Sequence, residues 1–302
     1  MKSVYIRVPA SSGNLGPGFD VLAAGLKLYQ ELEAHWTTKQ GVELHIEGES
    51  EESLSTPSKN MVCQILFKFL GKKIKKQGLF LQMKNGIPLA RGLGSSAAAS
   101  LAAFTAVEML SGSKNLQRAL ERTIQKEGHP DNAVASFCGG LVSCGFWEKQ
   151  LKTCAWKLPS DLTALIAVPD IKLSTEKARK ILPRTVPRQH AVSNMAGISG
   201  MLWSLSHRNY QNLKRFMQDF LHQPYRQKLV PGMRSVIQSA LEAGALGAAL
   251  SGAGPSILAI CHSKGNLNKI GRCMKDAFKH HGLSSRYQIL DFDNRGLHID
   301  VA

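Results

Sequence analysis

Apolar residues recur along the chain in two spacings, and these predict a succession of strands and helices. Short alternating or continuously apolar runs predict strands at 4–8, 21–28, 42–46, 79–83, 140–146, 162–168, 246–250, 257–260 and 287–292. Segments with an apolar residue at every third or fourth position, or rich in alanine, predict helices at 60–76, 97–103, 115–127, 174–183, 189–222, 236–243 and 266–281. We therefore expect strands and helices in both halves of the chain.

Several segments interrupt this pattern. Segment 9–20 holds two prolines, three glycines, an asparagine and an aspartate, which predicts a long rigid loop, with a wide hairpin as the alternative. The polar, acidic segment 48–58 predicts an exposed loop. Segment 143–162 predicts strands joined by exposed turns, and it is the best candidate for a domain boundary. We expect the last ten residues to form an edge strand or a tail.

A glycine turn feeds directly into the alanine-rich helix predicted at 97–103. Gly92 and Gly94 permit a tight turn and close approach of the backbone to a ligand, and Ser95 and Ser96 are suited to capping the helix. Such a turn directs unpaired N–H groups and the positive end of the helix dipole at one point, which favours phosphate binding. The Walker A and dinucleotide motifs do not fit the spacing. The alternative is a loop and a small-residue helix that merely pack on a sheet.

A second cluster of polar residues precedes the strand predicted at 140–146. Glu127, His129, Asp131 and Asn132 fall within six residues, separated by a glycine and a proline that impose an irregular backbone. A carboxylate near ATP would bind Mg²⁺, which prefers oxygen ligands. The alternative is a set of capping side chains for a short helix that begins at Asp131.

Length and composition exclude several classes of protein. The chain has 302 residues, 43% of them apolar, which suits one large or two ordinary folded domains. Its apolar runs are too short to span a membrane, and its N-terminus lacks the apolar core of a signal peptide, so we expect a cytoplasmic protein. Six cysteines occur without a C-x-x-C pair, which favours free thiols over a zinc or redox site.

The charge balance is strongly basic. A net charge of +16 suits either nucleic-acid binding or attraction of an anionic substrate such as ATP. The lysines and arginines are scattered, and no basic arm or RNA-binding motif occurs. We interpret the charge as solvated surface with some steering of phosphate, and we expect no nucleic-acid partner.

Three motifs together resemble the GHMP kinases, the family of galactokinase, homoserine kinase and mevalonate kinase. The central string P-x-x-x-G-L-G-S-S-A-A at 88–98 is the most specific, and S-G-A-G-P-S at 251–256 resembles the third motif. Segment 9–20 resembles the first motif of the homoserine kinase branch, and H-P-D-N at 129–132 separates that branch from the others. The chain departs from the pattern at Gly13, where the family usually has alanine, and at Ser136, where it usually has proline.

The resemblance covers essentially the whole chain and implies a two-domain α+β GHMP fold. The N-terminal half would resemble domain 2 of ribosomal protein S5, and the C-terminal half a ferredoxin-like domain. We expect an ATP-binding domain at 1–158 and a domain that contributes to substrate binding at 159–302, with the active site in the cleft between them.

The resemblance also implies roles for individual residues. ATP would contact the central loop and the start of its helix, at Pro88, Leu89, Ala90, Arg91, Gly92, Leu93, Gly94, Ser95, Ser96, Ala97 and Ala98. Asn60 would lie near the adenosine, although its position suits a helix N-cap equally well. Mg²⁺ would be held by Glu127 with Ser95 or Ser96. The amino-acid substrate would contact Asn14, Asp20, His129, Asp131, Asn132, Arg179 and Arg226.

The implied activity is ATP-dependent phosphorylation of the L-homoserine hydroxyl to O-phospho-L-homoserine, in threonine biosynthesis. Asp131 is the best candidate to accept the hydroxyl proton, and orientation of the alcohol is its alternative role. Two other functions stay open, a GHMP kinase for a mevalonate-like or sugar alcohol and a non-catalytic basic binding protein. We expect ATP and L-homoserine as partners and no membrane; the sequence leaves the oligomeric state open, with a homodimer as the candidate.

Overall fold

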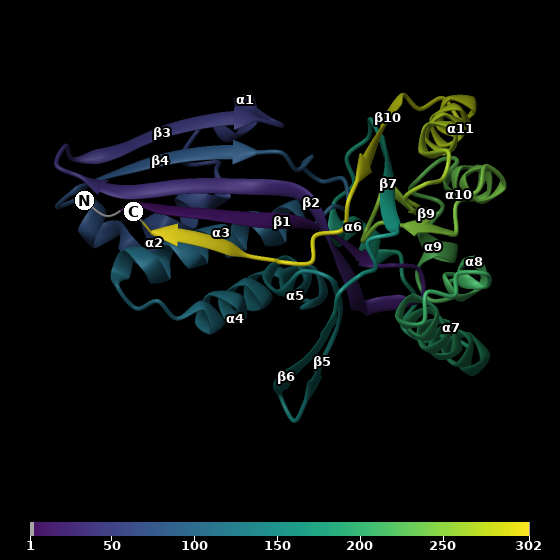
Figure 1. The fold of residues 1–302 in the computed structure, drawn as a ribbon. Helices are drawn as coiled ribbons and strands as arrows, with labels where there is room; N and C mark the ends of the chain where they lie inside the picture. Colours follow the sequence, from purple (N-terminus) through teal and green to yellow (C-terminus); the bar gives the residue numbers. More distant parts are fainter. Residues whose placement is uncertain (1–2, 302) are drawn as a thin grey trace.

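The computed structural model describes residues 3–301, which form two β-sheets and the helices that cover them (Figure 1). The larger sheet and its helices occupy one end of the molecule, and the smaller sheet and its helices occupy the other. Within the described residues, no helix combines the length and apolar character that crossing a membrane requires. The expected α+β fold class is confirmed.

The first sheet contains seven strands, in the order β11-β1-β2-β4-β3 with β5 paired to β2 and β6 to β5. They are β1 (Val4–Asn14), β2 (Gly18–Thr37), β3 (Gly41–Gly48), β4 (Gly78–Asn85), β5 (Leu141–Trp147), β6 (Gln150–Trp156) and β11 (His298–Val301). Val4, Ile6 and Val8 are buried while the residues between them are half-buried, because successive strand side chains point to opposite faces. The last strand pairs with β1, so the expected edge position of the C-terminal residues is confirmed.

Helices lie along one side of this sheet (Figure 1). They are α2 (Met61–Ile74), α3 (Ser95–Ser111), α4 (Leu116–Glu127) and α5 (Asp131–Cys138). Most of the residues of α3 are buried, and its alanines bring the helix axis close to its neighbours because a methyl group occupies little space. This close packing fixes the position of the N-terminus of α3, where the central motif ends.

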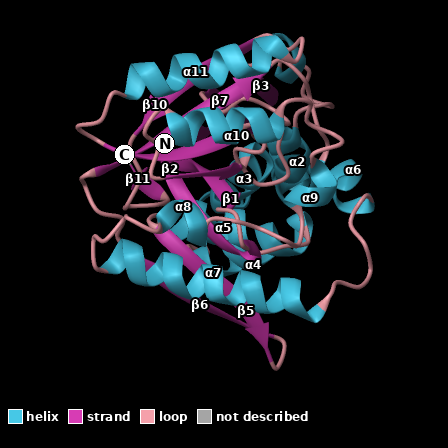
Figure 2. Cartoon of the chain, turned by 90° about the vertical axis from the view of Figure 1, so that its right-hand side faces the viewer, coloured by secondary structure: helices cyan, strands magenta, loops and turns pink. Residues whose placement is uncertain are grey.

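The second sheet is antiparallel and has the order β10-β7-β9-β8. Its strands are β7 (Leu162–Pro169), β8 (Gly247–Leu250), β9 (Ile257–His262) and β10 (Ser285–Leu290). Its helices are α6 (Thr175–Lys180), α7 (Arg188–Ser206), α8 (Leu213–Phe216), α9 (Gln223–Arg226), α10 (Met233–Glu242) and α11 (Leu267–His280). Helices α10 and α11 cover the face of this sheet that is turned toward the viewer in Figure 2. All eight residues of β7 are buried, as expected for a continuously apolar strand.

The long rigid loop expected at 9–20 is wrong, and the hairpin given as its alternative is confirmed. Strand β1 continues to Asn14, a turn occupies 15–17, and β2 begins at Gly18, so the segment is a hairpin. Pro9 is accommodated because the register of the two strands shifts beside it, at an irregularity of the kind that tolerates a missing N–H donor. The small residues that suggested a loop instead let this strand end lie close to other backbone segments.

Three further expectations need correction. Segment 48–58 is not entirely loop, because it contains the short surface helix α1 (Glu51–Leu54). The helical region expected at 189–222 is divided, since α7 ends at Ser206 and a polar stretch separates it from α8. The strand expected at 21–28 is part of the 20-residue β2, which continues to Thr37 and pairs with β4 from Gln30 onward.

Candidate active site

The central motif forms a loop that is held by the two motifs on either side of it in space. The N–H of Ser11 donates to the carbonyl of Leu93 at 3.1 Å, and the Oγ of Ser251 donates to the carbonyl of Gly92 at 2.7 Å. Gly92 has a φ of 74°, and a Cβ on it would lie 2.2 Å from the carbonyl oxygen of Ser251. Only glycine allows this contact, so the first and third motifs determine the path of the loop.

The loop leads directly into the N-terminus of α3. Gly94 is the N-cap, in the left-handed region with a φ of 68°, and it has no side chain to cap the helix. The expected capping by Ser95 and Ser96 is therefore wrong, because both residues lie within the first turn. Capping hydroxyls would occupy the first N–H groups of the helix. Because the N-cap is Gly94, the first N–H groups of the helix and the positive end of its dipole stay available to an anion.

A single cavity collects most of the predicted site residues. It is lined by residues of all three motifs, of the polar cluster at 127–132 and of the helices near the smaller sheet, namely Asn14, Asp20, Ala90, Arg91, Gly92, Leu93, Gly94, Ser95, Ser96, Ala97, Glu127, His129, Asp131, Asn132, Leu173, Thr175, Arg179, Arg226, Gly252, Ala253 and Gly254. These residues come from segments up to 240 residues apart (Asn14 to Gly254, 254 − 14 = 240), so the fold, rather than sequence proximity, assembles the cavity.

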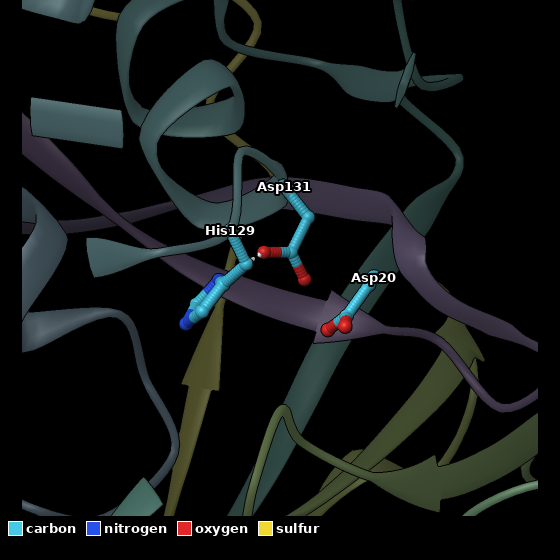
Figure 3. A group of neighbouring side chains, drawn as sticks. All are labelled: Asp20, His129 and Asp131. Atoms are coloured by element: carbon cyan, nitrogen blue, oxygen red, sulfur yellow. Dashed lines mark hydrogen bonds and ion pairs between the residues drawn. The ribbon is translucent and has the colours of Figure 1, made fainter. Parts of the chain in front are cut away.

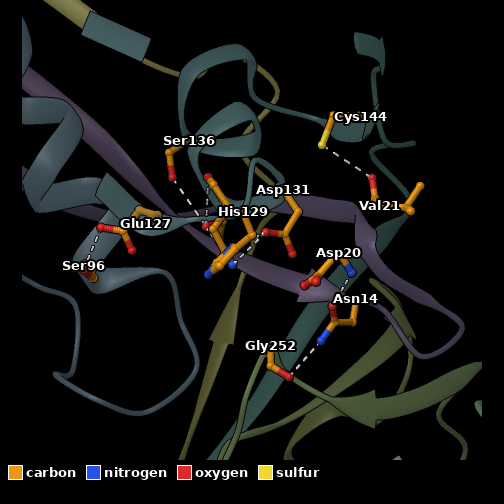
Figure 4. A network of polar contacts seen from close by, with 12 residues as sticks. Asn14, Asp20, Val21, Ser96, Glu127, His129, Asp131, Ser136, Cys144 and Gly252 are labelled. Carbon is orange, nitrogen blue, oxygen red and sulfur yellow. Dashed lines mark hydrogen bonds and ion pairs between the residues drawn. The ribbon is translucent and has the colours of Figure 1, made fainter. Parts of the chain in front are cut away.

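Glu127 lines the same cavity and lies directly beside the start of α3 (Figure 4). Its Oε1 accepts hydrogen bonds from the hydroxyls of Ser96 at 2.8 Å and Ser100 at 3.1 Å. Its Oε2 makes no hydrogen bond to another described residue. The arrangement offers one free carboxylate oxygen beside serine hydroxyls and a helix N-terminus, and an oxygen-preferring cation fits this donor set.

Asp131, His129 and Asp20 form a second group of neighbouring polar side chains in the lining of the cavity (Figure 3). The Nδ1 of His129 lies 2.7 Å from the Oδ1 of Asp131, which is buried. Burial alone would lower the pKa of His129, but the hydrogen bond to Asp131 and the charge of its carboxylate raise the pKa above its usual value. The Oδ2 of Asp131 makes no hydrogen bond among the described residues and remains available to a ligand.

Asp20 is paired with Arg179 through two hydrogen bonds, of 2.6 and 2.9 Å. This bidentate contact raises the pKa of Arg179. The ligand atoms of Asp20, His129 and Asp131 lie within 4.8 Å of one another, as in a metal site. However, the carboxylate of Asp20 is engaged by the guanidinium of Arg179, and the Oδ1 of Asp131 is engaged by the ring of His129. We therefore interpret this group as a network of ion pairs.

Arg226 approaches the same cavity from a buried position. Only 1% of its surface is exposed, its Nε donates to the carbonyl of Ala178 at 3.2 Å, and its Nη1 donates to the carbonyl of Gly252 at 3.0 Å. Burial lowers the pKa of its guanidinium to about 10, and repulsion from Arg179 adds to the effect. Its Nη2 has no hydrogen-bond partner among the described residues, so one end of the fork is left for an anion.

The two asparagines of the site mainly position its backbone. Asn14 donates from Nδ2 to the carbonyl of Gly252 at 2.9 Å and accepts at Oδ1 from the N–H of Asp20 at 3.1 Å (Figure 4). The Oδ1 of Asn132 accepts from the hydroxyl of Ser11 at 2.9 Å. Both side chains connect the hairpin of the first motif to the segments opposite it, so they hold Asp20 and the helix α5 in place.

Family models for the N-terminal and the C-terminal domain of one enzyme family both match this chain. The model described as the GHMP kinases N-terminal domain matches residues 60–140, and the model described as GHMP kinases C terminal matches residues 201–280. The chain belongs to the GHMP kinase family. GHMP kinases use ATP as a substrate, and the cavity of this member contains the glycine loop and helix N-terminus that suit a nucleotide phosphate.

Relatives of this GHMP kinase extend over the full chain. Two curated proteins named homoserine kinase are 35% identical, from Persephonella marina, and 39% identical, from Caldanaerobacter subterraneus. The first alignment covers 100% of this chain and 99% of the relative, and the second covers 98% and 95%. A crystal structure of homoserine kinase from Cytophaga hutchinsonii superposes with a TM-score of 0.83 and 31% identity, over 99% of this chain and 97% of that one.

Four of the residues expected to bind the nucleotide lie outside the main cavity of this GHMP kinase. Ala98 is fully buried, and Pro88 lines a separate pocket together with Leu89. Asn60 caps α2, since its Oδ1 accepts from the N–H of Val62 at 2.9 Å. Asn60 and Leu89 also line a largely apolar cavity of about 340 Å³, which shares Ser95 and Ser96 with the main one.

Sequence reasoning missed three residues around the site. Ser100 lies one helical turn after Ser96, so the spacing of four residues on a predicted helix could have indicated it. Phe19 lies under both arginines, with ring-centroid distances of 5.6 Å to the Cζ of Arg179 and 5.2 Å to that of Arg226. His222 contacts Arg226, four residues later in the chain, and no feature of the local sequence distinguishes it from a surface histidine.

Proposed function

We propose that this GHMP kinase is a homoserine kinase, an ATP:L-homoserine O-phosphotransferase that forms ADP and O-phospho-L-homoserine. The observation that carries the proposal is one cavity in which a phosphate-binding loop faces a paired aspartate and arginine and a second, buried arginine. The full-length relatives named homoserine kinase support it. A free amino acid carries a carboxylate and an ammonium group, and this cavity offers a complementary charge to each.

We assign the triphosphate of ATP to the central loop and the N-terminus of α3. The N–H groups there are free of capping side chains and stabilise negative charge on the transferred phosphoryl group. We assign the adenosine to the adjoining apolar cavity lined by Asn60 and Leu89, because an aromatic base favours an apolar environment.

We assign Mg²⁺ to Glu127, with Ser95 or Ser96 as the second protein ligand. The free Oε2 of Glu127 and the neighbouring hydroxyls fit a cation that binds few protein oxygens and takes its other ligands from phosphate and water. When bound, Mg²⁺ neutralises charge that develops on the phosphate oxygens during transfer. The residues of this chain hold the ion on the side of the cavity that faces the loop.

We assign the substrate amino acid to the ion-pair side of the cavity. Its carboxylate binds Arg179 and the free Nη2 of Arg226, and its ammonium group binds Asp20. Because Asp20 and Arg179 already neutralise each other, a ligand with only one charge would leave one of them without its partner. A zwitterion compensates both, and this favours an amino acid over a mevalonate-like acid or a sugar.

Asp131 is the group we assign to the reacting hydroxyl. Its Oδ1 is fixed by His129, and its free Oδ2 accepts the hydrogen bond of the alcohol and then its proton. His129 orients the carboxylate and balances its charge. Most of the catalysis then comes from alignment of the hydroxyl with the phosphoryl group, and such positioning supplies roughly 7–11 kcal/mol in favourable cases.

The remaining expectations stay proposals of ours. We propose an ATP-binding domain at 1–158 and a substrate-binding domain at 159–302, with β11 returning to the first sheet. We also propose that the enzyme works in the cytoplasm and binds no nucleic acid, and either a monomer or a homodimer is compatible with this site.

An assay of ADP release tests the proposed function directly. Purified protein is supplied with ATP and Mg²⁺ and with homoserine, mevalonate or shikimate in turn. We expect ADP release with homoserine at least about 100-fold faster than with the other alcohols, because only the amino acid satisfies both charges of the site. Faster turnover of mevalonate or of shikimate would contradict the proposal.

A further inference from the structure

We propose that His222 is a positioning residue that holds Arg226 in the orientation needed to bind the substrate carboxylate. The inference rests on the proposed function, since it concerns the amino-acid end of that site. His222 is fully buried and lines no cavity with the predicted site residues, so it acts through Arg226 rather than on the substrate. Three contacts of its ring support this role.

The first contact joins the imidazole to the guanidinium. The Nδ1 of His222 lies 3.2 Å from the Nη1 of Arg226, one helical turn later in the chain. A guanidinium nitrogen can only donate, so Nδ1 must be the unprotonated, accepting nitrogen of the ring. The same Nη1 donates to the carbonyl of Gly252, and the two acceptors together direct Nη2 toward the cavity.

The second contact joins the other ring nitrogen to the first motif. The Nε2 of His222 lies 2.9 Å from the carbonyl oxygen of Gly16, in the turn between β1 and β2. A carbonyl can only accept, so Nε2 must carry the proton. Both contacts require the same neutral tautomer, which is strong geometric support for a defined role. The turn that it holds is followed by Asp20, so one ring connects both ends of the proposed amino-acid site.

The third contact is a stack with Phe19. The rings of Phe19 and His222 lie 5.3 Å apart at an angle of 27°, and the guanidinium of Arg226 lies over the same Phe19 ring. The charged groups that act on the imidazole are Asp219, Arg226 and Asp20. Burial outweighs the attraction of the two aspartates and lowers the pKa of His222 to about 4, in agreement with the neutral ring that the contacts require.

Two substitutions separate the two hydrogen bonds of the ring. His222→Asn places an amide at the position of Nδ1 and keeps an acceptor for Arg226, while His222→Gln reaches the position of Nε2 and keeps a donor for Gly16. We expect His222→Gln to raise the KM for homoserine about 10- to 100-fold, because a charged donor loses its partner. We expect His222→Asn to raise it less than about 3-fold, with the KM for ATP unchanged in both.

His207→Gln is the matched control. His207 is exposed, directly follows α7, and its ring contacts the carbonyl of Trp203, which does not line the cavity. Equal KM values for homoserine in the wild type and His222→Gln would overturn the proposal. A parallel rise in the KM for ATP in both His222 variants would also overturn it, because that result indicates a general loss of structure. Absence of any turnover of homoserine by the wild type is different, since it contradicts the proposed function itself.

NMR of the wild-type protein tests the state of the His222 ring without any variant and without any assumption about the substrate. Nitrogen NMR of the imidazole rings distinguishes the two neutral tautomers and the charged ring. We expect His222, identified by its proximity to Phe19, to remain the neutral Nε2–H tautomer from about pH 5 to pH 8. A ring protonated at Nδ1 within this range cannot accept from Arg226 and would overturn the proposal.

Discussion

The two sides of the cavity consist of different chemical groups, backbone on one side and charged side chains on the other. The side assigned to ATP consists of backbone and small residues, with glycine at the cap of α3 and no capping side chain. The side assigned to the amino acid consists of charged side chains that are already paired, such as Asp20 with Arg179 and His129 with Asp131. One side leaves its hydrogen-bond donors free, and the other side satisfies most of its charges in advance.

This difference follows from what each side has to recognise. A triphosphate is highly charged and tolerant of geometry, so bare N–H groups around a fixed loop suffice, and a glycine-rich backbone supplies them. A small zwitterion has two opposite charges close together. Before it binds, buried charges of the site that lacked partners would be strongly destabilising, so the site pairs them with one another. The path of the glycine loop therefore determines the ATP side, and a network of hydrogen-bonded charges determines the amino-acid side. Substitutions that affect one side and spare the other test the comparison.

The largest effect is expected for Asp131→Asn on the amino-acid side. The amide keeps an oxygen for His129 but provides no acceptor for the hydroxyl proton, so kcat should fall about 10²- to 10⁴-fold. The KM for ATP should remain within about 2-fold, because no residue of the loop changes. Steady-state ADP release with Asp276→Asn as the control, an exposed aspartate on α11, measures this. Near-normal turnover would remove Asp131 from the chemistry.

The next effect is expected for Gly92→Ala on the ATP side. A Cβ would lie 2.2 Å from the carbonyl of Ser251, so the loop must move, and the KM for ATP should rise about 10-fold or more. The KM for homoserine should change by less than about 3-fold. Gly112→Ala is the matched control, because its φ of 83° imposes the same backbone strain while nothing lies within 4 Å of the added Cβ. Equal effects of the two variants on ATP would contradict a steric role for the loop.

The sequence predicted the ATP side better than the amino-acid side, and the comparison explains why. The loop and the helix after it were predictable from local sequence alone, because the spacing of Gly92 and Gly94 and the run of alanines in α3 indicate them directly. The capping by Ser95 and Ser96 was predicted wrongly, because propensity favours serine at a cap and the ligand site requires a bare one. The hairpin at 9–20 was predicted as a loop because small residues suit a turn and a close approach of backbones equally well.

The amino-acid side depends on contacts between distant segments. Arg179 and Arg226 were identified only through the resemblance to a family, since each has the local sequence of an ordinary helix residue. Nothing near His222 in the sequence indicates that its ring lies between Arg226 and Gly16, a residue more than 200 positions earlier (222 − 16 = 206). Such three-dimensional networks cannot be read from periodicity, because their members share no spacing.

The third prediction concerns the stability of the amino-acid side at low pH. The pKa of His222 is lowered to about 4 in the folded state from an ordinary value near 6.5, so the unfolded chain binds this proton first. The contribution of His222 to the free energy of unfolding should therefore be fully present above about pH 6.5 and should fall by about 1–3 kcal/mol between there and pH 4. Urea unfolding at several pH values measures it. This decrease should be absent from the pH profile of His222→Asn, and identical pH profiles for the wild type and this variant would contradict the assignment.

The smallest effect is expected for Gly13→Ala, where β1 passes the side chains of Asp131 and Asn132. An added Cβ would lie 2.8 Å from the Oδ2 of Asp131, the oxygen assigned to the reacting hydroxyl, and 3.1 Å from the Nδ2 of Asn132. The carboxylate can shift slightly, so we expect kcat to fall only about 2- to 5-fold, with a gain of about 0.5–1 kcal/mol in stability from the less flexible unfolded chain. Gly71→Ala in α2 is the control, because nothing lies within 4 Å of its added Cβ and it should gain stability without loss of kcat. An unchanged kcat in Gly13→Ala would show that the position of the Oδ2 of Asp131 does not limit the reaction, and it would weaken the contrast between a site fixed by its charges and a site fixed by its backbone.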